Sequence, residues 1–77
     1  MSGPRRSVMI AGHPWTLLIT MEEEMDSLGC RVEFQALTLD GTTADHWEVE
    51  YERVEDALRA IEMTYGVGPG DWTELGP

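Results

Sequence analysis

The Asp40-Gly41 dipeptide is the sequence feature that most constrains the fold, because Asp-Gly favours a two-residue hairpin loop between paired strands. Apolar and polar residues alternate on both sides of it, over residues 30–39 and 46–52. This alternation is typical of strands that bury one face. We therefore expect a β-hairpin whose apolar side chains share one face. The loop predicts the pairs Leu39–Thr42, Phe34–Trp47, Val32–Val49 and Cys30–Tyr51.

A second hairpin precedes the first, because residues 15–25 also alternate and end at a turn over residues 26–29 with glycine last. Its register predicts the pairs Met25–Cys30, Glu23–Val32, Met21–Phe34 and Ile19–Ala36. An alternative remains open, since Thr20 and Glu23 form a capping-box pattern that would begin a short helix over residues 21–28. We prefer the strand, because Asp26-Ser27-Leu28-Gly29 is favourable chemistry for a four-residue hairpin turn, and the resulting register places the apolar residues of all three strands on one face.

A helix is predicted over residues 54–65, where apolar residues recur at helical spacing. These residues are Val54, Ala57, Leu58, Ile61 and Tyr65. Glu55 and Asp56 lie in the first turn, where the helix dipole favours acidic side chains, and Gly66 is placed to end the helix. Neither the sheet nor the helix can bury its apolar stripe alone, so the helix must cover the sheet.

Together these elements predict an α+β fold in one domain over residues 1–77, a three-stranded antiparallel meander with one C-terminal helix on one face. Short extra edge strands are expected over residues 8–11 and 71–75, the second anchored by Trp72. A mobile tail is the alternative for the second strand. Residues 1–7 suggest a flexible arm, and residues 67–77 a tail rich in glycine and proline.

Charge restricts the function more than any motif does. The chain has 15 acidic residues, five arginines and no lysine, for a net charge of −10. Nucleic-acid backbones and anionic membranes need basic surfaces, so neither is an expected partner. Basic proteins, divalent cations and mimicry of nucleic acid remain compatible. The short apolar run after Arg5-Arg6 is neither a signal peptide nor a membrane span, and the single cysteine, Cys30, suggests a reducing, cytoplasmic location.

The sheet face that points away from the helix is the candidate binding surface. We expect a protein partner to contact Glu22, Glu24, Glu33, Glu48, Glu50, Leu18 and Leu37. The predicted registers place Glu22, Glu33 and Glu48 side by side, with Glu24, Arg31 and Glu50 in the next row. Because directly opposed like charges destabilise a sheet, this row indicates a basic partner or a hard cation. The alternatives are a solvated acidic face, and Val8 and Ile10 folding over the leucines.

Catalysis has little support in the sequence. His13 and His46 are far apart, Ser7 and Ser27 have no local base, and Cys30 is expected inside the sheet as a small buried hydrophobe. One cysteine and two separated histidines do not form a zinc set. The glycine-rich stretch after the helix does not open a helix, so it is not a phosphate-binding loop. We therefore expect no cofactor, no metal and no enzymatic activity.

Two segments carry a family resemblance. An alternating strand begins Trp15-Thr16-Leu17-Leu18-Ile19 and runs into an acidic hairpin tip, and the helix begins Val54-Glu55-Asp56-Ala57-Leu58. Over residues 15–65 the chain resembles the N-terminal domain of HicB-type antitoxins. The resemblance implies a βββα unit that sequesters a small basic RNA-cleaving toxin.

These observations favour a small acidic module that inhibits or adapts a larger basic protein. Antitoxins, immunity proteins and phage-encoded inhibitors all fit this description. One alternative is a metal-dependent phosphodiester enzyme, or a remnant of one, that uses the row of carboxylates. Two others are a structural homodimer, which would enlarge the thin core, and a nucleic-acid mimic.

Overall fold

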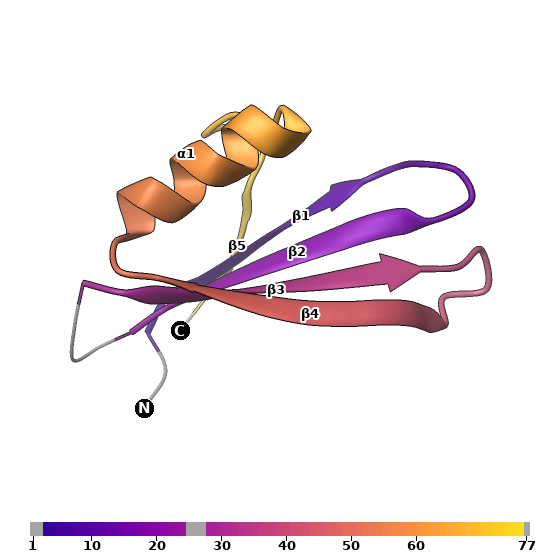
Figure 1. Ribbon diagram of the computed structural model, residues 1–77, viewed down its shortest axis with the longest axis horizontal. Coiled ribbons are helices and arrows are strands. Elements are labelled where there is room, and N and C mark those ends of the chain that lie inside the picture. The colour runs from indigo at the N-terminus through magenta and orange to yellow at the C-terminus, as the bar shows by residue number, and fades with distance from the viewer. Residues whose placement is uncertain (1–2, 25–27, 77) are drawn as a thin grey trace.

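The computed structural model describes residues 3–24 and 28–76 and has an α+β architecture (Figure 1). Its elements are β1 (Arg5–Ile10), β2 (Thr16–Glu23), β3 (Cys30–Leu37), β4 (Thr43–Tyr51), α1 (Val54–Tyr65) and β5 (Thr73–Gly76). The strands form one antiparallel sheet in the order β4-β3-β2-β1-β5. The prediction of an α+β meander with one helix is thus confirmed, and the sheet gains β1 and β5.

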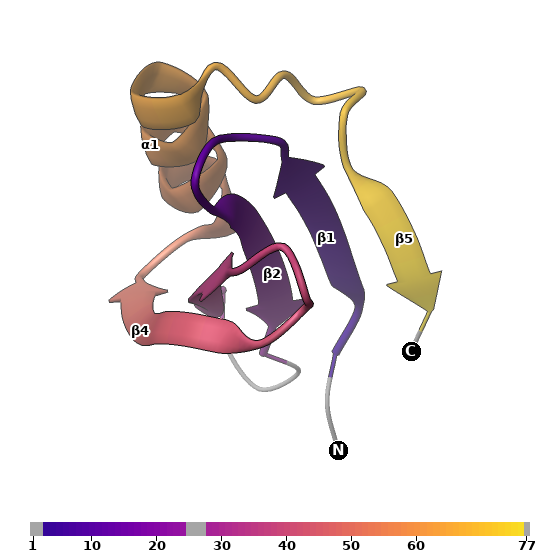
Figure 2. The ribbon, with the colours of Figure 1, turned by 90° about the vertical axis from the view of Figure 1, so that its right-hand side faces the viewer.

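The core lies between α1 and one face of the sheet (Figure 2). Its buried residues are Ile19, Met21, Cys30, Val32, Phe34, Ala57, Ile61 and Val67. Alternation along β2 and β3 directs the core side chains of these two strands towards the helix, and the residues between them point to the opposite face. Figure 2 shows α1 on one side of the sheet only. The helix therefore leaves a second sheet face that is available for contact.

The β3–β4 hairpin has the predicted register from Cys30↔Tyr51 to Ala36↔Asp45. Phe34 and Trp47 face each other as expected and stack with ring centroids 5.3 Å apart. The predicted loop, however, is wrong. The Thr38 N–H donates to the Thr42 carbonyl, which gives a three-residue loop with Gly41 at a φ of 86°.

Asp40 explains the longer loop. Its carboxylate accepts hydrogen bonds from the Thr38 hydroxyl and the Thr42 N–H, which fastens both ends of the turn. The register then shifts between Ala36 and Leu37, so that Leu37 pairs with Thr43 and the expected Leu39–Thr42 pair does not form.

The β2–β3 register differs from the prediction by two residues. The observed pairs include Glu23↔Cys30, Met21↔Val32 and Ile19↔Phe34. A shift of two keeps every side chain on its predicted face, so the apolar pattern cannot distinguish the two registers. Charge pairing distinguishes the two registers. The observed register sets Glu22 opposite Arg31, whereas the predicted register set Glu22 opposite Glu33.

The turn that joins β2 to β3 lies partly outside the described residues, since Met25, Asp26 and Ser27 are not described. Glu24 N–H donates to the Gly29 carbonyl, which extends the ladder beyond Glu23↔Cys30. The alternative of a helix over residues 21–28 is wrong at residues 21–23, which belong to β2.

The helix spans the predicted residues, Val54–Tyr65. Its buried positions are Ala57 and Ile61, and it ends where Gly66 adopts a left-handed φ of 74°. The Gly66 N–H donates to the Glu62 carbonyl, which satisfies one of the free carbonyls of the last turn. Arg53 at the N-cap makes no side-chain cap hydrogen bond, as its residue type suggests.

β1 is longer and more central than expected. It begins at Arg5, so residues 5–7 form a strand where an arm was predicted, and it pairs with both β2 and β5. Arg6 lies on the helix side of β1 and forms a 2.7 Å ion pair with Glu23. β5 confirms a strand in the tail, and Trp72 before it packs against the core as its predicted anchor.

Candidate protein-binding face

The outer face of the sheet, which we define as the face turned away from α1, carries every second side chain of β1–β4. Antiparallel pairing aligns these side chains in rows across the strands. One row consists of Glu50, Arg31, Glu22 and Arg5, from β4 to β1. Arg31 donates a 3.0 Å hydrogen bond to the Glu22 carboxylate within an ion pair. Charges of opposite sign therefore alternate along this row.

The adjacent row is acidic. Glu48 on β4 lies directly opposite Glu33 on β3, and Thr20 and Ser7 continue the row on β2 and β1. No arginine lies in this row of the described strands. Glu50 follows on the same face of β4, and its neighbour Arg31 is bound to Glu22. We call Glu33, Glu48 and Glu50 the acidic patch.

Apolar side chains occupy the other end of the outer face. Met9 pairs with Leu18 across β1 and β2, and Leu37 lies on β3 opposite Thr16. Met9 is 63% exposed, and both leucines are half-buried. We call Met9, Leu18 and Leu37 the apolar patch. The alternative in which Val8 and Ile10 fold over the leucines is wrong, because both residues are in β1 and pack against the core.

Not every predicted site residue joins these patches. The two-residue register shift removes Glu22 from the row of Glu33 and Glu48 and pairs it with Arg31. The same shift sets Glu22, in place of Glu24, opposite Arg31, so the predicted row of Glu24, Arg31 and Glu50 is also wrong. Glu33, Glu48, Glu50, Leu18 and Leu37 lie on the outer face as predicted.

His46 is a candidate metal ligand that sequence analysis did not place with the glutamates. It precedes Glu48 by two positions on β4, and one ligand atom each of Glu33, His46 and Glu48 lies within 4.8 Å of the others. The signal was the His-x-Glu spacing on a strand, which places both side chains on one face. Two carboxylates and an imidazole are ligands of divalent transition metals.

A small hollow of about 70 Å³ opens between the two charged rows. It is lined by Arg5, Thr20, Glu22, Arg31 and Glu33. The Nε atom of Arg31 is buried there and has no hydrogen-bond partner among the described residues.

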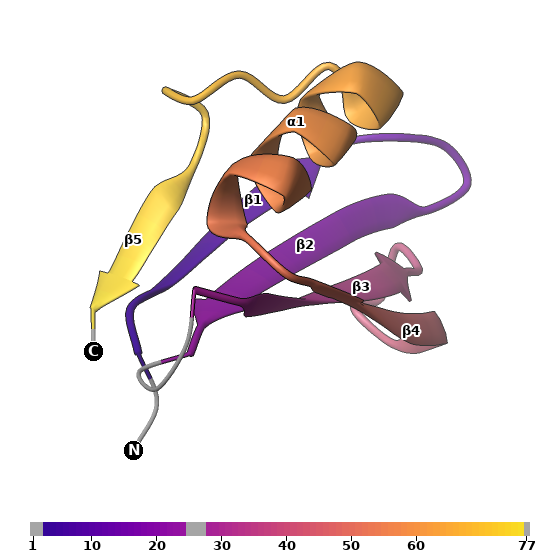
Figure 3. The ribbon, with the colours of Figure 1, turned by 60° about the vertical axis from the view of Figure 1, so that its left-hand side comes forward.

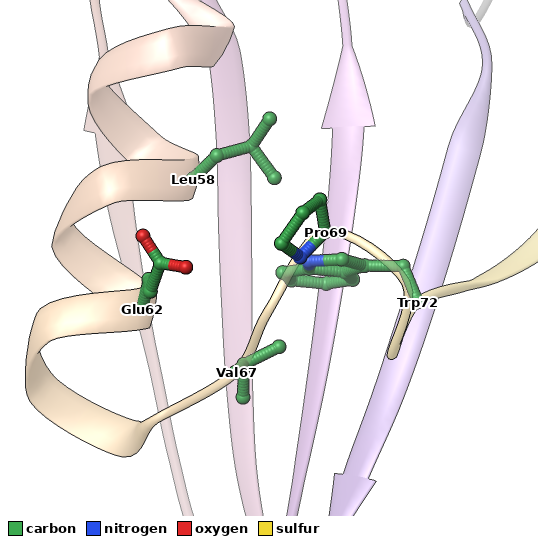
Figure 4. A pocket seen from close by; sticks show the side chains of 5 residues that line it. All are labelled: Leu58, Glu62, Val67, Pro69 and Trp72. Atoms are coloured by element: carbon green, nitrogen blue, oxygen red, sulfur yellow. The ribbon is translucent and has the colours of Figure 1, made fainter.

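A second hollow, of about 160 Å³, lies between α1 and the segment that leads to β5 (Figure 4). It is lined by Leu58, Glu62, Val67, Pro69 and Trp72. Figure 4 shows Glu62 on the helix side and Pro69 and Trp72 on the other. Glu62 is its one ionisable lining residue, so the hollow contains no acid–base pair for catalysis.

The ends of β2 and β3 expose two large apolar side chains. Trp15, which was expected on the buried face, is 54% exposed, and Leu39 in the hairpin loop is 90% exposed. Both line a shallow depression next to Asp40. Hydrogen bonds from Thr38 and Thr42 lower the pKa of Asp40 to about 2, so this exposed carboxylate remains charged at neutral pH.

Cys30 lies on the other face of the sheet and is buried in the core, as predicted. Burial raises the pKa of its thiol, and the nearby Glu23 carboxylate adds to this effect. The thiol is therefore poorly suited to nucleophilic chemistry.

Comparisons with known proteins identify no relative. No protein-family model, no curated protein and no solved structure matches the chain. The resemblance to HicB-type antitoxins therefore stays a prediction. Among the described residues, no helix has the length and apolar character needed to cross a membrane.

Proposed function

We propose that this protein binds a larger basic protein through the outer face of its sheet, as an inhibitor, an antitoxin-like protein or an adaptor. The observation that carries the proposal is the acidic patch, where Glu48 directly opposes Glu33 in a row without an arginine. Directly opposed like charges destabilise a sheet, and a basic partner would relieve that repulsion.

The surroundings of the acidic patch support protein binding over binding of a small cation alone. The apolar patch lies on the same face, with Met9 63% exposed. Specific protein interfaces commonly combine an apolar centre with charged residues around it. The formal net charge of −10 would also speed the approach of a basic protein through long-range attraction.

A charge-reversal experiment tests the proposal. The Glu33→Lys/Glu48→Lys variant should lose capture of the basic partner that the wild-type protein retains from lysate of its host. Glu55→Lys/Glu62→Lys is the matched control, because it changes the net charge equally on the exposed side of α1. We expect this control to retain capture, and circular dichroism should confirm that both variants fold. Undiminished capture by Glu33→Lys/Glu48→Lys would reject the proposal.

Metal binding is the second candidate function, favoured by the convergence of Glu33, His46 and Glu48 within 4.8 Å. The carboxylate row that was expected for a phosphodiester enzyme lacks Glu22, which pairs with Arg31. Without Glu22, the remaining candidate is a site for Zn²⁺ or Mn²⁺ formed by Glu33, His46 and Glu48. Thermal melting with these ions should show stabilisation that His46→Ala abolishes. No shift at millimolar metal would eliminate this candidate.

A further inference from the structure

β4 forms one edge of the sheet and pairs with β3 alone among the described strands. The opposite edge is β5 (Figure 3). In an antiparallel edge strand, about every second residue directs its backbone N–H and C=O groups away from the sheet. These groups form a ready template for another extended chain.

The two edges differ in how well they could accept such a chain. β5 has four residues, and its pairing with β1 is irregular between Arg5 and Arg6. β4 has nine residues and a regular register from Asp45 to Tyr51. Short or bulged edges resist strand addition, whereas long regular edges permit it. β4 is therefore the edge that suits an incoming strand.

The side chains of β4 define what kind of strand would fit. Every residue from Thr43 to Glu50 is exposed. On the outer face β4 presents Glu48 and Glu50, and on the helix side it presents Trp47 and Val49, which are 38% and 37% exposed. Cross-strand neighbours lie on the same face of a sheet. A complementary strand thus alternates basic residues facing the glutamates with apolar residues facing Trp47 and Val49.

We infer that β4 binds an extended basic segment of the partner, which adds to the sheet as a sixth strand. The inference rests on the proposed function and deepens it, because it names the element that binds and the conformation of the partner's segment. A second copy of this chain fits the same edge less well. Each copy has a net charge of −10, and an alignment of Trp47 with Val49 of the copy sets Glu48 against Glu48.

Two peptides of equal composition test the inference. In the first, VKVKVKV with capped ends, lysine and valine alternate as a complementary strand requires. In the second, VKKVVKV with capped ends, the alternation is broken but the charge is the same. We expect the alternating peptide to bind about tenfold more tightly, in a fluorescence titration at low salt, because backbone pairing adds to charge attraction.

Hydrogen exchange measured by NMR identifies the binding element. The alternating peptide should slow exchange of outward-facing amides in β4, residues 43–51, by about tenfold or more, with no change in β5. Glu48→Lys/Glu50→Lys should abolish this protection, whereas Glu55→Lys/Glu62→Lys should preserve it.

The other outcomes separate the inference from the proposed function. Equal binding of both peptides without protection of β4 would overturn strand addition and leave the acidic face as a charge-based binding surface. Failure of both peptides to bind would contradict the inference and the proposed function together. Protection of β4 that grows with protein concentration in the absence of peptide would identify a second copy as the occupant and also overturn the inference.

Discussion

Replacing Glu48 with glutamine should raise the thermal stability of the protein while weakening its binding to a basic partner. Glu48 lies directly opposite Glu33 on the outer face, and one ligand oxygen of each carboxylate lies within 4.8 Å of the other. Glutamine has nearly the same shape and removes only the charge. The substitution therefore isolates the repulsion between the two carboxylates.

The magnitude follows from this separation. At 4.8 Å, the upper limit of this separation, two unit charges in water repel by about 0.9 kcal/mol, and salt at about 0.15 M reduces this to about 0.5 kcal/mol. Both values lie within the range of about 0.2–1 kcal/mol for cross-strand pairs. For a domain of this length, such a change in the free energy of unfolding raises the melting temperature by about 2–7 °C.

Glu50 provides a matched control two positions away on the same face of β4. Glu50 lies opposite Arg31, so Glu50→Gln removes an attraction and should leave the melting temperature unchanged or lower it. Both variants should be melted at pH 8 in about 20 mM and about 1 M sodium chloride, because high salt screens surface charges. A Glu48→Gln variant that is less stable than wild type, or whose gain persists in high salt, would refute the electrostatic reasoning.

Three further predictions concern the scaffold of the site. Ile61→Ala, at a position 1% exposed, should lower the free energy of unfolding by about 2–5 kcal/mol in urea titrations. That is a large share of the about 4–12 kcal/mol expected for this length, and a loss below about 1 kcal/mol would contradict the packing of α1. Gly66→Ala should lower the free energy of unfolding by about 1–2 kcal/mol, because the φ of Gly66 is 74°. Gly70→Ala should be nearly neutral, because Gly70 has no positive φ. Equal losses in the two variants would refute the argument from φ. NMR titration of Asp40 should give a midpoint of about 2, and Thr38→Val should move it towards 3.8. Because the folded pKa is lowered, the hairpin keeps this stabilisation above the unfolded pKa and loses it as pH falls through about 2.

The sequence was sufficient to predict which side chains face the helix. Alternation determines the face of each residue in β2, β3 and β4, and it is unaffected by a shift of two residues. The β3–β4 register was predictable because Asp40-Gly41 restricts the loop. The loop is one residue longer than predicted, and a register shift between Ala36 and Leu37 compensates for the extra residue. The β2–β3 register was not predictable from apolar pattern alone, because its turn has several compatible lengths.

The contribution of charge pairs was the part that sequence analysis missed. A flexible arm was predicted over residues 1–7, but Arg6 lies on the helix side of β1 and is paired with Glu23, which also lies on that side. A pattern that counts every arginine as exposed therefore begins the strand too late. The same oversight placed Glu22 in the acidic row. Arg31 faces a glutamate in both registers, Glu24 in the predicted one and Glu22 in the observed one, but only the predicted register sets Glu22 against Glu33.

The charges on β4 bear on whether its long open edge would pair with a second copy of the chain. Natural edge strands are shielded, bulged or charged, and β4 has Asp45, Glu48 and Glu50. A second copy brings the same charges, whereas a basic strand brings the opposite ones, so under our proposal the same residues would oppose self-pairing and favour the partner. Glu48→Gln/Glu50→Gln should therefore lose partner binding and gain concentration-dependent self-association in sedimentation experiments. A variant that lost binding but stayed monomeric at all concentrations would separate the two roles, and protection of the edge would then require a cause other than charge.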